Sequence, residues 1–469
     1  MYSFLNDEIF VTARRCAAEL NVDAYVIGGF VRDHFLKRES KDIDIVTIGK
    51  GTDMATRFFE LLGEEAHLSI FRNFGTAQVR YRELEIEFVG ARRESYNRDS
   101  RKPIVEDGTL EDDQNRRDFT INALAIGLSA GNYGRLLDPF GGLKDLEEGI
   151  LRTPLDPDIT YSDDPLRMMR AIRFSSQLGF TIEDRSLEAI STNSARINIV
   201  SMERITDELN KIILSPRPSV GFKLLFDTGL LQLIFPEMAK LQGTETIKGL
   251  SHKDNFYHTL EVLDNVASKS NNLWLRWAAI LHDIAKPATK RFEPGHGFTF
   301  HGHEDKGARM VPGVFAKLKL PLNEKMKYVQ KLVALHLRPI VLAKTEVTDS
   351  AVRRLLFEAG DDIDDLMTLC ESDITTKNPS KVKRYLHNFE IVRQKLVELE
   401  EKDRLRNWQP PVTGEEIMRL YNLPPGRLIG VLKNALREAI LDGHVQNTYD
   451  SARAFLDAEF RKHQAEGSA

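Results

Sequence analysis

The spacing of apolar residues divides the chain into a mixed first part and a helical remainder. A helical period over residues 1–21 is followed by short apolar runs of the length and alternation typical of β-strands. The clearest run alternates Glu83, Glu85 and Glu87 with apolar residues, as expected of a strand with one buried face. The predicted strands are Ala24–Ile27, Asp42–Val46, Ala77–Tyr81 and Leu84–Val89.

Beyond these strands, residues 91–115 are polar and charged, and we expect a mobile loop there. From Asp164 onward the pattern is helical almost to the end. The sequence therefore predicts an α+β protein, with a small mixed α/β head followed by an all-α neck, body and tail. The expected boundaries are 1–150 for the head, 151–240 for the neck, 241–405 for the body and 406–469 for the tail.

Composition excludes some classes of protein but does not identify a function. The formal net charge of −5 gives no global signature of nucleic-acid binding, although a local basic surface remains compatible with it. The only two cysteines, Cys16 and Cys370, argue against a disulfide framework and favour the reducing cytoplasm. Because charged residues interrupt the most apolar stretch, near Leu273–Ala285, we expect no membrane-spanning segment.

The first candidate for chemistry is a turn between a predicted strand and a predicted helix. Gly28 and Gly29 permit close approach of the backbone to a phosphate, and Arg32 adds a charged donor. Double-glycine turns are common, so an ordinary tight turn remains the alternative.

Two aspartates follow on the next predicted strand. Asp42 and Asp44 share one face of that strand, with carboxylates roughly 7 Å apart. Such a pair suits Mg²⁺ and the two-metal mechanism of phosphoryl transfer, although an exposed polar strand face is the alternative. A third carboxylate usually completes a site of this kind. Glu85 and Glu87 are both candidates, and the sequence does not choose between them.

Five motifs together resemble one family. Gly28–Asp33 with Asp42 and Asp44 resembles the first motif of class II tRNA nucleotidyltransferases, the bacterial-type CCA-adding enzymes and their poly(A) polymerase relatives. The later motifs follow in the same order over residues 28–204, and the resemblance implies a polymerase-β-like head. They are Arg116–Ala123 (ribose and phosphates), Asp138–Gly142 (hinge), Asp163–Arg167 (base selection) and Glu203-Arg204 (support in the neck).

The resemblance assigns base selection to Asp164 and Arg167. Aspartate only accepts hydrogen bonds and arginine only donates them, so the pair complements the pairing edges of cytosine and adenine and rejects uracil and guanine. An ordinary surface ion pair is the alternative. The residues implied to bind the nucleotide and its phosphates are Gly28, Gly29, Arg32, Arg117, Asn122, Arg170 and Arg173.

Two segments bear on the branch of the family. Phe71–Val79 has the form expected of CCA enzymes and not of poly(A) polymerases. The CC-adding branch tends to lack a flexible loop between the first two motifs, and residues 91–115 are long enough to supply one. Full CCA addition is therefore favoured, with CC-only or A-only addition left open.

The body contains a second set of potential ligands. His258, the pair His282-Asp283, and Asp373 resemble the metal ligands of the HD superfamily of phosphohydrolases. His303 and His336 are candidates for further ligands or phosphate contacts. Imidazole and carboxylate ligands suit Mg²⁺, Mn²⁺, Ni²⁺ or Fe. The alternatives are satisfied histidines at helix ends, or an HD fold retained for tRNA binding.

The expected function is template-independent addition of CCA to the 3′ end of tRNA from CTP and ATP, with Mg²⁺ bound by Asp42 and Asp44. The competing hypothesis is a metal-dependent HD phosphohydrolase acting on RNA ends or nucleotides, whose head only binds RNA or nucleotide. A pseudoenzyme that binds RNA is less favoured, because the acidic and basic motif positions are all present. The oligomeric state stays open.

Overall fold

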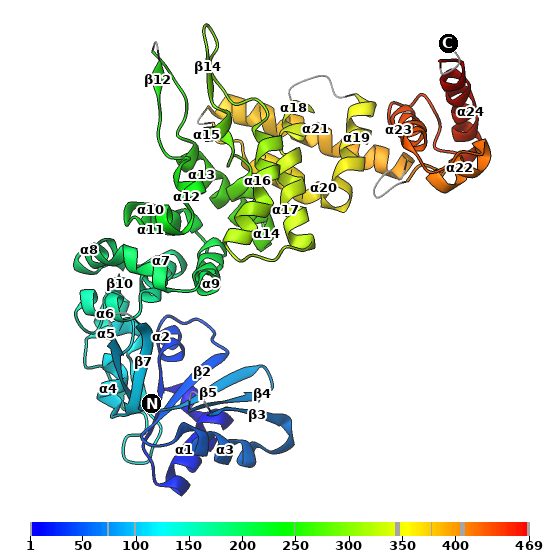
Figure 1. Ribbon diagram of the computed structural model, residues 1–469. Coiled ribbons are helices and arrows are strands. Elements are labelled where there is room, and N and C mark those ends of the chain that lie inside the picture. The colour runs from blue at the N-terminus through cyan, green and yellow to red at the C-terminus, as the bar shows by residue number, and fades with distance from the viewer. Residues whose placement is uncertain are drawn as a thin grey trace. The chain divides into compact units, whose positions relative to one another are not determined.

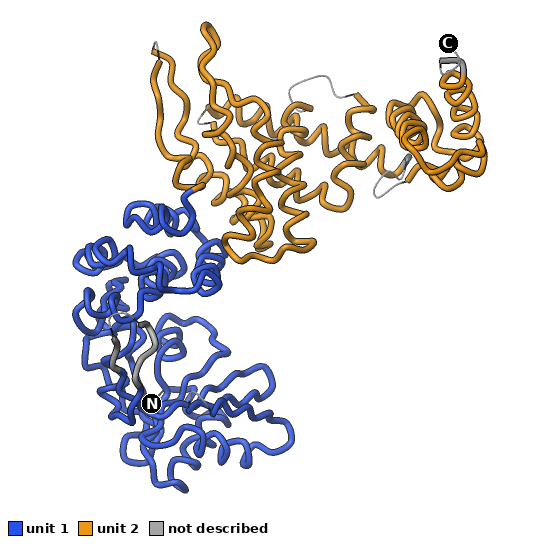
Figure 2. The backbone as a smooth tube through the Cα atoms, in the orientation of Figure 1, with its two compact units in different colours: residues 1–236 blue, residues 237–469 orange. Residues whose placement is uncertain are grey.

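The computed structural model forms two compact units, Met1–Pro236 and Glu237–Ala469 (Figure 2). The division lies close to the boundary expected at residue 240, while the boundaries expected at 150 and 405 fall inside the units and stay predictions. The described residues are all except 1, 73–74, 98–99, 248, 343–347, 377, 404–408 and 467–469, with the backbone alone at 95–97, 100–104, 402–403 and 465–466. Part of the Phe71–Val79 segment thus lies outside the described residues.

A seven-stranded sheet forms the head, in the order β3-β4-β5-β2-β1-β8-β9. Neighbouring strands are antiparallel except β2 and β5, which run parallel at its centre. The strands are β1 Ala24–Ile27, β2 Asp42–Thr47, β3 Ala66–Phe71, β4 Thr76–Tyr81, β5 Leu84–Gly90, β8 Ala125–Gly127 and β9 Leu136–Leu137. All four predicted strands are present, and β3, β8 and β9 add to them.

One face of this sheet is covered by α1 (Glu8–Leu20) and α3 (Gly51–Leu62), visible beneath the strands in Figure 1. The hydrophobic core lies between them and includes Phe10, Phe58 and Phe88, all essentially buried. Because side chains alternate along a strand, the residues between these core positions point to the opposite face. That face carries the acidic side chains of β2 and β5.

Residues 91–115, expected to be a loop, are instead ordered elements. β6 (Arg92–Asn97) and β7 (Ser100–Asp107) form an antiparallel pair, and α4 (Leu110–Asn115) follows. The hydroxyl of Thr109 accepts a hydrogen bond from the Asp112 backbone, and the Asp112 side chain accepts one in return, which is a capping box. The described residues of this stretch form two strands and a capped helix, so the loop prediction was wrong for them, and residues 98–99 lie outside the described residues.

The rest of the first unit is mainly helical. The turn after β1 leads into α2 (Gly29–Phe35), and α7 (Leu166–Leu178) packs against α9 (Met202–Ile213) and α10 (Pro218–Asp227). A Cβ atom on Gly221 would lie 2.4 Å from the side chain of Ile212, so glycine permits the close approach of α10. The other helices are α5 Gly142–Glu148, α6 Pro157–Asp163, α8 Asp184–Asn193, α11 Leu230–Ile234 and α12 Pro236–Ala239.

Helices also dominate the second unit. They are α13 Asn255–Ala267, α14 Leu273–Leu281, α15 Lys286–Thr289, α16 His303–Lys317, α17 Glu324–Leu335, α18 Leu337–Leu342, α19 Asp349–Ala359, α20 Ile363–Ser372, α21 Pro379–Asp403, α22 Gly414–Tyr421, α23 Arg427–Leu441 and α24 Tyr449–Glu466. Two small hairpins modify the all-α expectation: β12 Thr246–Ile247 with β13 Leu250–Ser251, and β14 Arg291–Glu293 with β15 Gly297–Thr299. Short β10 (Ile150–Leu151) and β11 (Thr181–Ile182) do the same in the first unit.

Within the described residues, every helix is too short or too polar to span a bilayer. The last three helices enclose a small core of their own, which includes Leu432, Leu436 and Leu456. The sequence-predicted α+β class, a mixed head followed by helical segments, is confirmed.

Candidate active site and metal centre

A polar cavity of about 460 Å³ opens on the acidic face of the head sheet. It lies entirely within the first unit and combines six carboxylates with six guanidinium groups and one lysine. The lining residues are Asp44, Thr76, Glu87, Val89, Arg92, Arg116, Arg117, Asp118, Asp164, Leu166, Arg167, Arg170, Arg204, Asp207, Glu208 and Lys211. Side chains that the sequence places more than 120 positions apart thus meet in one site.

The glycine turn lies beside two of the lining residues, Asp44 and Arg117. Gly28 has φ +83°, and a Cβ atom there would lie 3.2 Å from Asp44 Oδ2 and 2.8 Å from Arg117 Nη1. The missing side chain therefore makes room for both groups. Burial raises the pKa of Asp44, the guanidinium of Arg117 opposes this shift, and the Asp42 carboxylate adds to it. A cation beside Asp44 would relieve the desolvation of its charged form.

Strand register decides how the other carboxylates are placed. In the parallel pair, Asp44 lies opposite Glu87 and Asp42 lies opposite Glu85. Glu87 lines the cavity, and desolvation followed by the Asp44 charge raises its pKa. Glu85 accepts a hydrogen bond from Gln78 at 3.0 Å instead. Asp42 is exposed at the start of β2. Register therefore favours Glu87 as the third carboxylate.

Two consecutive arginines share one buried carboxylate. Asp113 Oδ1 accepts from Arg116 Nε at 2.9 Å and Nη2 at 2.5 Å. Its Oδ2 accepts from Arg117 Nε at 3.2 Å and Nη2 at 3.1 Å. The side chain of Asp113 is fully buried and does not line the cavity. Both guanidinium groups are therefore held from behind the cavity wall.

A second network links the head motif to α7. Arg170 donates to Asp118 Oδ2 at 2.6 Å, and Asn122 donates to Asp118 Oδ1 at 2.9 Å. Arg32 donates in turn to Asn122 Oδ1 at 2.9 Å. Burial alone would raise the pKa of Asp118, but Arg170, Asn122 and Arg167 outweigh burial and lower it to about 2. Asp118 is therefore an anion that fixes the first turns of α7 against the head.

The expected base-selecting pair lies at the start of α7. Asp164 immediately precedes the helix, and its Oδ1 accepts a hydrogen bond from the Leu166 backbone. Arg167 donates from Nη2 to the carbonyl of Arg116 at 2.5 Å. Both side chains line the cavity, but the hydrogen bond of Arg167 goes to backbone and not to Asp164.

Not every residue expected to contact the nucleotide lies in the cavity wall. Arg173 is buried and paired with Glu208 at 3.2 Å, and its pKa falls to about 10 because burial disfavours its charge. Arg32 is buried between Asn122 and Asp33. Gly28, Gly29 and Asn122 also lie behind the lining residues. The structure thus divides the expected set into lining and supporting side chains.

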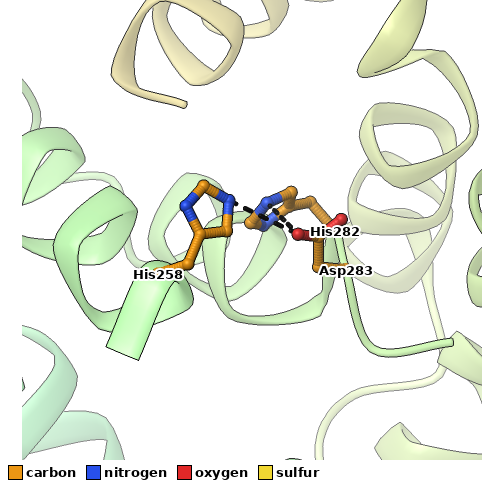
Figure 3. A group of neighbouring side chains, drawn as sticks. All are labelled: His258, His282 and Asp283. Atoms are coloured by element: carbon orange, nitrogen blue, oxygen red, sulfur yellow. Dashed lines mark ion pairs between the residues drawn. The ribbon is translucent and has the colours of Figure 1, made fainter. Parts of the chain in front are cut away.

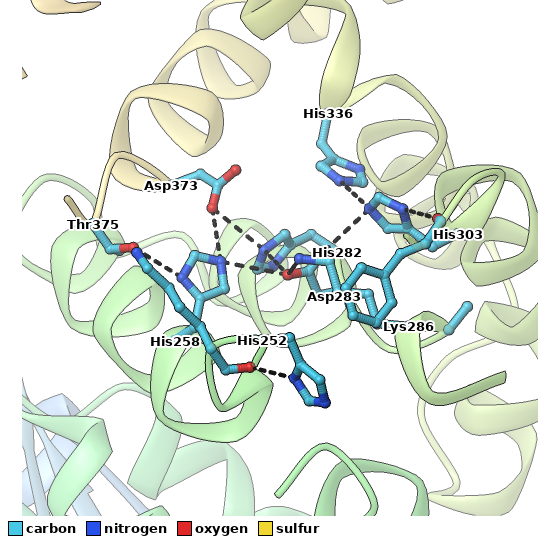
Figure 4. Close-up of polar contacts among 12 residues, drawn as sticks. His252, His258, His282, Asp283, Lys286, His303, His336, Asp373 and Thr375 are labelled. Carbon is cyan, nitrogen blue, oxygen red and sulfur yellow. Dashed lines mark hydrogen bonds and ion pairs between the residues drawn. The ribbon is translucent and has the colours of Figure 1, made fainter. Parts of the chain in front are cut away.

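In the second unit, four imidazoles converge from four segments (Figure 4). The Nδ1 atoms of His282, His303 and His336 lie 2.7, 2.8 and 2.7 Å from the carbonyl oxygens of Ala279, Phe300 and Val333. Because a carbonyl only accepts, each Nδ1 carries a proton, and Nε2 carries a lone pair wherever the imidazole is neutral. The Nε2 atoms of His303 and His336 lie 3.3 Å apart. His258 Nδ1 is bonded to the Thr375 hydroxyl at 3.0 Å.

Asp283 is the centre of this cluster (Figures 3 and 4). Its Oδ2 lies 3.4 Å from His258 Nε2 and 3.2 Å from His282 Nε2. Its Oδ1 lies 3.2 Å from His303 Nε2. Asp373 Oδ1 completes the set at 2.9 Å from His258 Nε2. Two groups with the spacing of metal ligands therefore share Asp283, namely His258, His282 and Asp283, and Asp283, His303 and His336.

The donor set of this cluster fits a divalent metal. His282 Nε2 is buried without a hydrogen-bond partner among the described residues, and a lone pair left in this state is unfavourable unless a cation accepts it. Burial lowers the pKa of His336 to about 4, so its imidazole is neutral and available as a ligand. The Nδ1 contacts supply the second shell that orients such ligands.

Comparisons with known proteins match the chain along most of its length. The family models that match are the poly A polymerase head domain over residues 24–152, the probable RNA and SrmB-binding site of polymerase A over 179–241, and the HD domain over 255–373. An A-adding tRNA nucleotidyltransferase of Deinococcus radiodurans is 35% identical over 74% of this chain and 79% of its own. A CC-adding tRNA nucleotidyltransferase of Thermus thermophilus is 31% identical over 92% of this chain and 93% of its own.

The chain belongs to the tRNA nucleotidyltransferase family. The fold agrees, since the crystal structure of the Bacillus stearothermophilus CCA-adding enzyme in complex with CTP matches with a TM-score of 0.70 at 23% identity, covering 98% of this chain and all of that chain. The sequence-based resemblance, to a bacterial-type nucleotidyltransferase with an HD domain, is confirmed. Both the nucleotidyltransferase and HD folds imply dependence on divalent metals in general.

Sequence reasoning missed three side chains of this nucleotidyltransferase that the geometry singles out. Asp118 was read only as part of its motif, and Asp113 only as part of a polar stretch. The ion pair of Asp118 with Arg170 joins residues 52 positions apart and has no local signal, whereas Asp113 lies three and four residues before Arg116 and Arg117. Lys286 lies 2.5 Å from Asp283 Oδ2 and three residues after it, and that i,i+3 spacing could have identified it.

Proposed function

We propose that the protein adds CCA to the 3′ end of tRNA, using CTP and ATP. In this reaction the terminal 3′-hydroxyl forms a bond to the α-phosphorus of the nucleotide, and the bond between the α- and β-phosphates breaks to release pyrophosphate. The observation that supports this most is a single cavity in which Asp44 and Glu87 face Arg117, Asp164 and Arg167. Nucleotidyl transfer needs these two kinds of group together.

In the proposal, Asp42, Asp44 and Glu87 hold Mg²⁺. Bound Mg²⁺ would lower the pKa of the attacking hydroxyl and offset charge on the triphosphate. Arg117 lies beside Asp44 and is expected to neutralise phosphate oxygens. On the other side of the cavity, Asp164 accepts and Arg167 donates hydrogen bonds to the base, a pattern that fits cytosine and adenine.

Relatives that add only CC or only A share this chemistry, so full CCA addition rests on a further feature. That feature is the length of residues 91–115, between the first two motifs, where the CC-adding branch tends to lack a flexible loop; the described part of this stretch contains β6, β7 and α4. By their names, the two relatives add A and CC, and the structural neighbour is a CCA-adding enzyme. We also propose the cytoplasm as the compartment, because both cysteines are unpaired thiols.

Sequencing the products on three tRNAs tests this proposal. The substrates end before CCA, after C, and after CC, and each is incubated with CTP and ATP. Extension of all three to a complete CCA end is expected. Extension that stops at CC, or that starts only from CC, would establish a partial activity, and a long A tail would establish a poly(A) polymerase. Asp44→Ala should abolish every addition, while His258→Ala should leave it intact.

The HD cluster supports a second candidate function, hydrolysis of phosphate esters. Five side chains form two groups with the spacing of metal ligands that share Asp283, and a cavity of about 290 Å³ adjoins His258 and Asp373. Lys253 and Lys286 line that cavity beside the aromatic ring of Tyr385, so it could admit a nucleotide or an RNA end. The metal would be Mg²⁺, Mn²⁺, Ni²⁺ or Fe.

A crossed pair of variants separates the two functions. Release of phosphate from a nucleoside 2′,3′-cyclic phosphate or a 3′-phosphorylated RNA is measured with each metal added in turn. Activity should vanish in Asp283→Ala and persist in Asp44→Ala. If no hydrolysis is detected with any of the metals, the HD unit has a structural or tRNA-binding role instead.

A further inference from the structure

Asp113 is the buried charge that organises the cavity without entering it. It lies in α4, and its two oxygens each accept two hydrogen bonds from one arginine, three and four residues further along. Its side chain is fully buried. Side-on pairing of this kind fixes the plane of each guanidinium as well as its position.

The two arginines held in this way serve different halves of the cavity. Arg117 extends Nη1 toward the Asn122 carbonyl at 3.4 Å and lies at the Gly28 turn beside Asp44. Arg116 presents its backbone carbonyl to Arg167 Nη2 at 2.5 Å. One half is the expected metal and phosphate side, and the other is the expected base-selecting side.

Without Asp113 this arrangement would be unstable. Arg116 and Arg117 are adjacent in sequence and carry like charges, and each long side chain has considerable rotamer entropy. Glu94 Oε1 pairs with Arg92 at 2.8 Å and with Arg116 at 3.4 Å, while Asp113 accepts from both Arg116 and Arg117. Asp113 is therefore the shared restraint on both guanidinium groups among the described residues.

We propose that Asp113 is a positioning residue for nucleotide addition, which sets Arg117 against the triphosphate and, through the Arg116 carbonyl, sets Arg167 against the base. The inference rests on the proposed nucleotidyl transfer and deepens it. Asp113 does not touch the substrate in this assignment, and its effect is transmitted only through the two arginines.

Asp113→Asn tests the assignment, with Asp112→Asn as the matched control. Asp112 lies on the same helix, caps it through Thr109 and pairs with exposed Arg93, so its loss removes the same charge without touching the cavity. We expect Asp113→Asn to lower kcat/KM for both CTP and ATP by about tenfold to a hundredfold, and to raise incorporation of U and G. Asp112→Asn should keep wild-type kinetics and fidelity.

A double-mutant cycle distinguishes positioning from general support of the fold. If Asp113 acts through Arg117, Asp113→Asn should cost little more activity in an Arg117→Lys background. Losses that simply multiply would overturn the assignment, as would wild-type kinetics and fidelity in Asp113→Asn. If Asp113→Asn folds poorly, the double variant Asp113→Asn, Arg116→Gln removes one positive charge together with the negative one. Its nucleotide addition should still be impaired, because Arg117 lacks its partner.

Calorimetric titration with CTP and Mg²⁺, without tRNA, keeps this inference separate from the proposed function. A wild type that adds nothing to trimmed tRNA would refute the function. Weaker CTP binding in Asp113→Asn than in Asp112→Asn would still support the positioning role, and equal binding would refute it.

Discussion

Replacing Gly28 with alanine tests how closely the glycine turn and the cavity depend on each other. Gly28 has φ +83° and ψ −136°, where a residue with a Cβ atom is strained by roughly 1–3 kcal/mol. The added methyl would lie 2.8 Å from Arg117 Nη1, whereas ordinary contact begins near 3.4 Å. The guanidinium would therefore have to move by about 0.6 Å, the difference between these distances. The methyl would also lie 3.2 Å from Asp44 Oδ2.

Gly63 provides a control with the same backbone strain and no neighbour. It has φ +75° and ψ −152°, and a Cβ atom there would meet nothing within 4 Å. Alanine at either position should lower the free energy of unfolding by a similar amount, roughly 1–3 kcal/mol. Only Gly28→Ala displaces groups of the candidate active site, so the two variants separate strain from loss of chemistry.

The assay is incorporation of labelled CMP into trimmed tRNA, alongside urea unfolding of both variants. Because displacements below 1 Å at a catalytic site reduce rates strongly, Gly28→Ala should lose about tenfold to a hundredfold in kcat/KM for CTP. Gly63→Ala should lose little beyond what its stability explains. Equal activity in the two alanine variants, at equal stability, would refute the reasoning that this turn makes room for Arg117 and Asp44.

Three further outcomes follow from the same cavity. Glu87→Gln should reduce nucleotide addition about a hundredfold or more, measured at saturating Mg²⁺, whereas Glu85→Gln should not, because only Glu87 lines the cavity. Arg167→Ala should raise the rate of U and G incorporation relative to C and A by roughly tenfold to a hundredfold, measured by sequencing the added ends. The pKa of Asp118 is lowered to about 2 in the folded protein, against an ordinary value of 3.8. Asp118 therefore stabilises the fold fully above pH 4, and this contribution is lost as the pH falls through 2. The free energy of unfolding should therefore be measured against pH for wild type and for Asp118→Asn. The difference between the two proteins should shrink by roughly 2 kcal/mol over that range.

Local patterns of apolar residues were sufficient to predict β1 and β5. Ala24–Ile27 is β1 as predicted, and the alternation around Glu85 and Glu87 identified β5. The prediction for residues 91–115 failed because β6 and β7 are held together by backbone pairing and α4 is stabilised by a cap. Neither feature requires an apolar face. Hydrophobic period does not detect such elements.

The local pattern of residues along a strand does not reveal its register with the neighbouring strand. From the sequence Glu85 and Glu87 are equivalent, since both lie on the polar face of one strand. The parallel pairing of β2 with β5 places Glu87 opposite Asp44, and only this long-range pairing separates them. In the same way, spacing predicted that Asp164 and Arg167 are neighbours, but the hydrogen bond of Arg167 to the Arg116 carbonyl depends on packing of α7 against the head.

The packing of the histidine cluster around Asp283 indicates whether the HD unit binds a metal or serves only as a scaffold. A histidine cluster kept only as a scaffold would be expected to satisfy its own lone pairs, as buried polar groups normally do. Here the Nδ1–H groups of His282 and His303 donate to carbonyls three residues earlier, which leaves their Nε2 atoms facing the buried carboxylate of Asp283. Lone pairs facing an anion in a buried site destabilise the fold without a cation or proton between them. Bonds to Asp283 and Asp373 outweigh the effect of burial and raise the pKa of His258 to about 9, so the cluster favours positive charge, which agrees with the general dependence of HD folds on divalent metals.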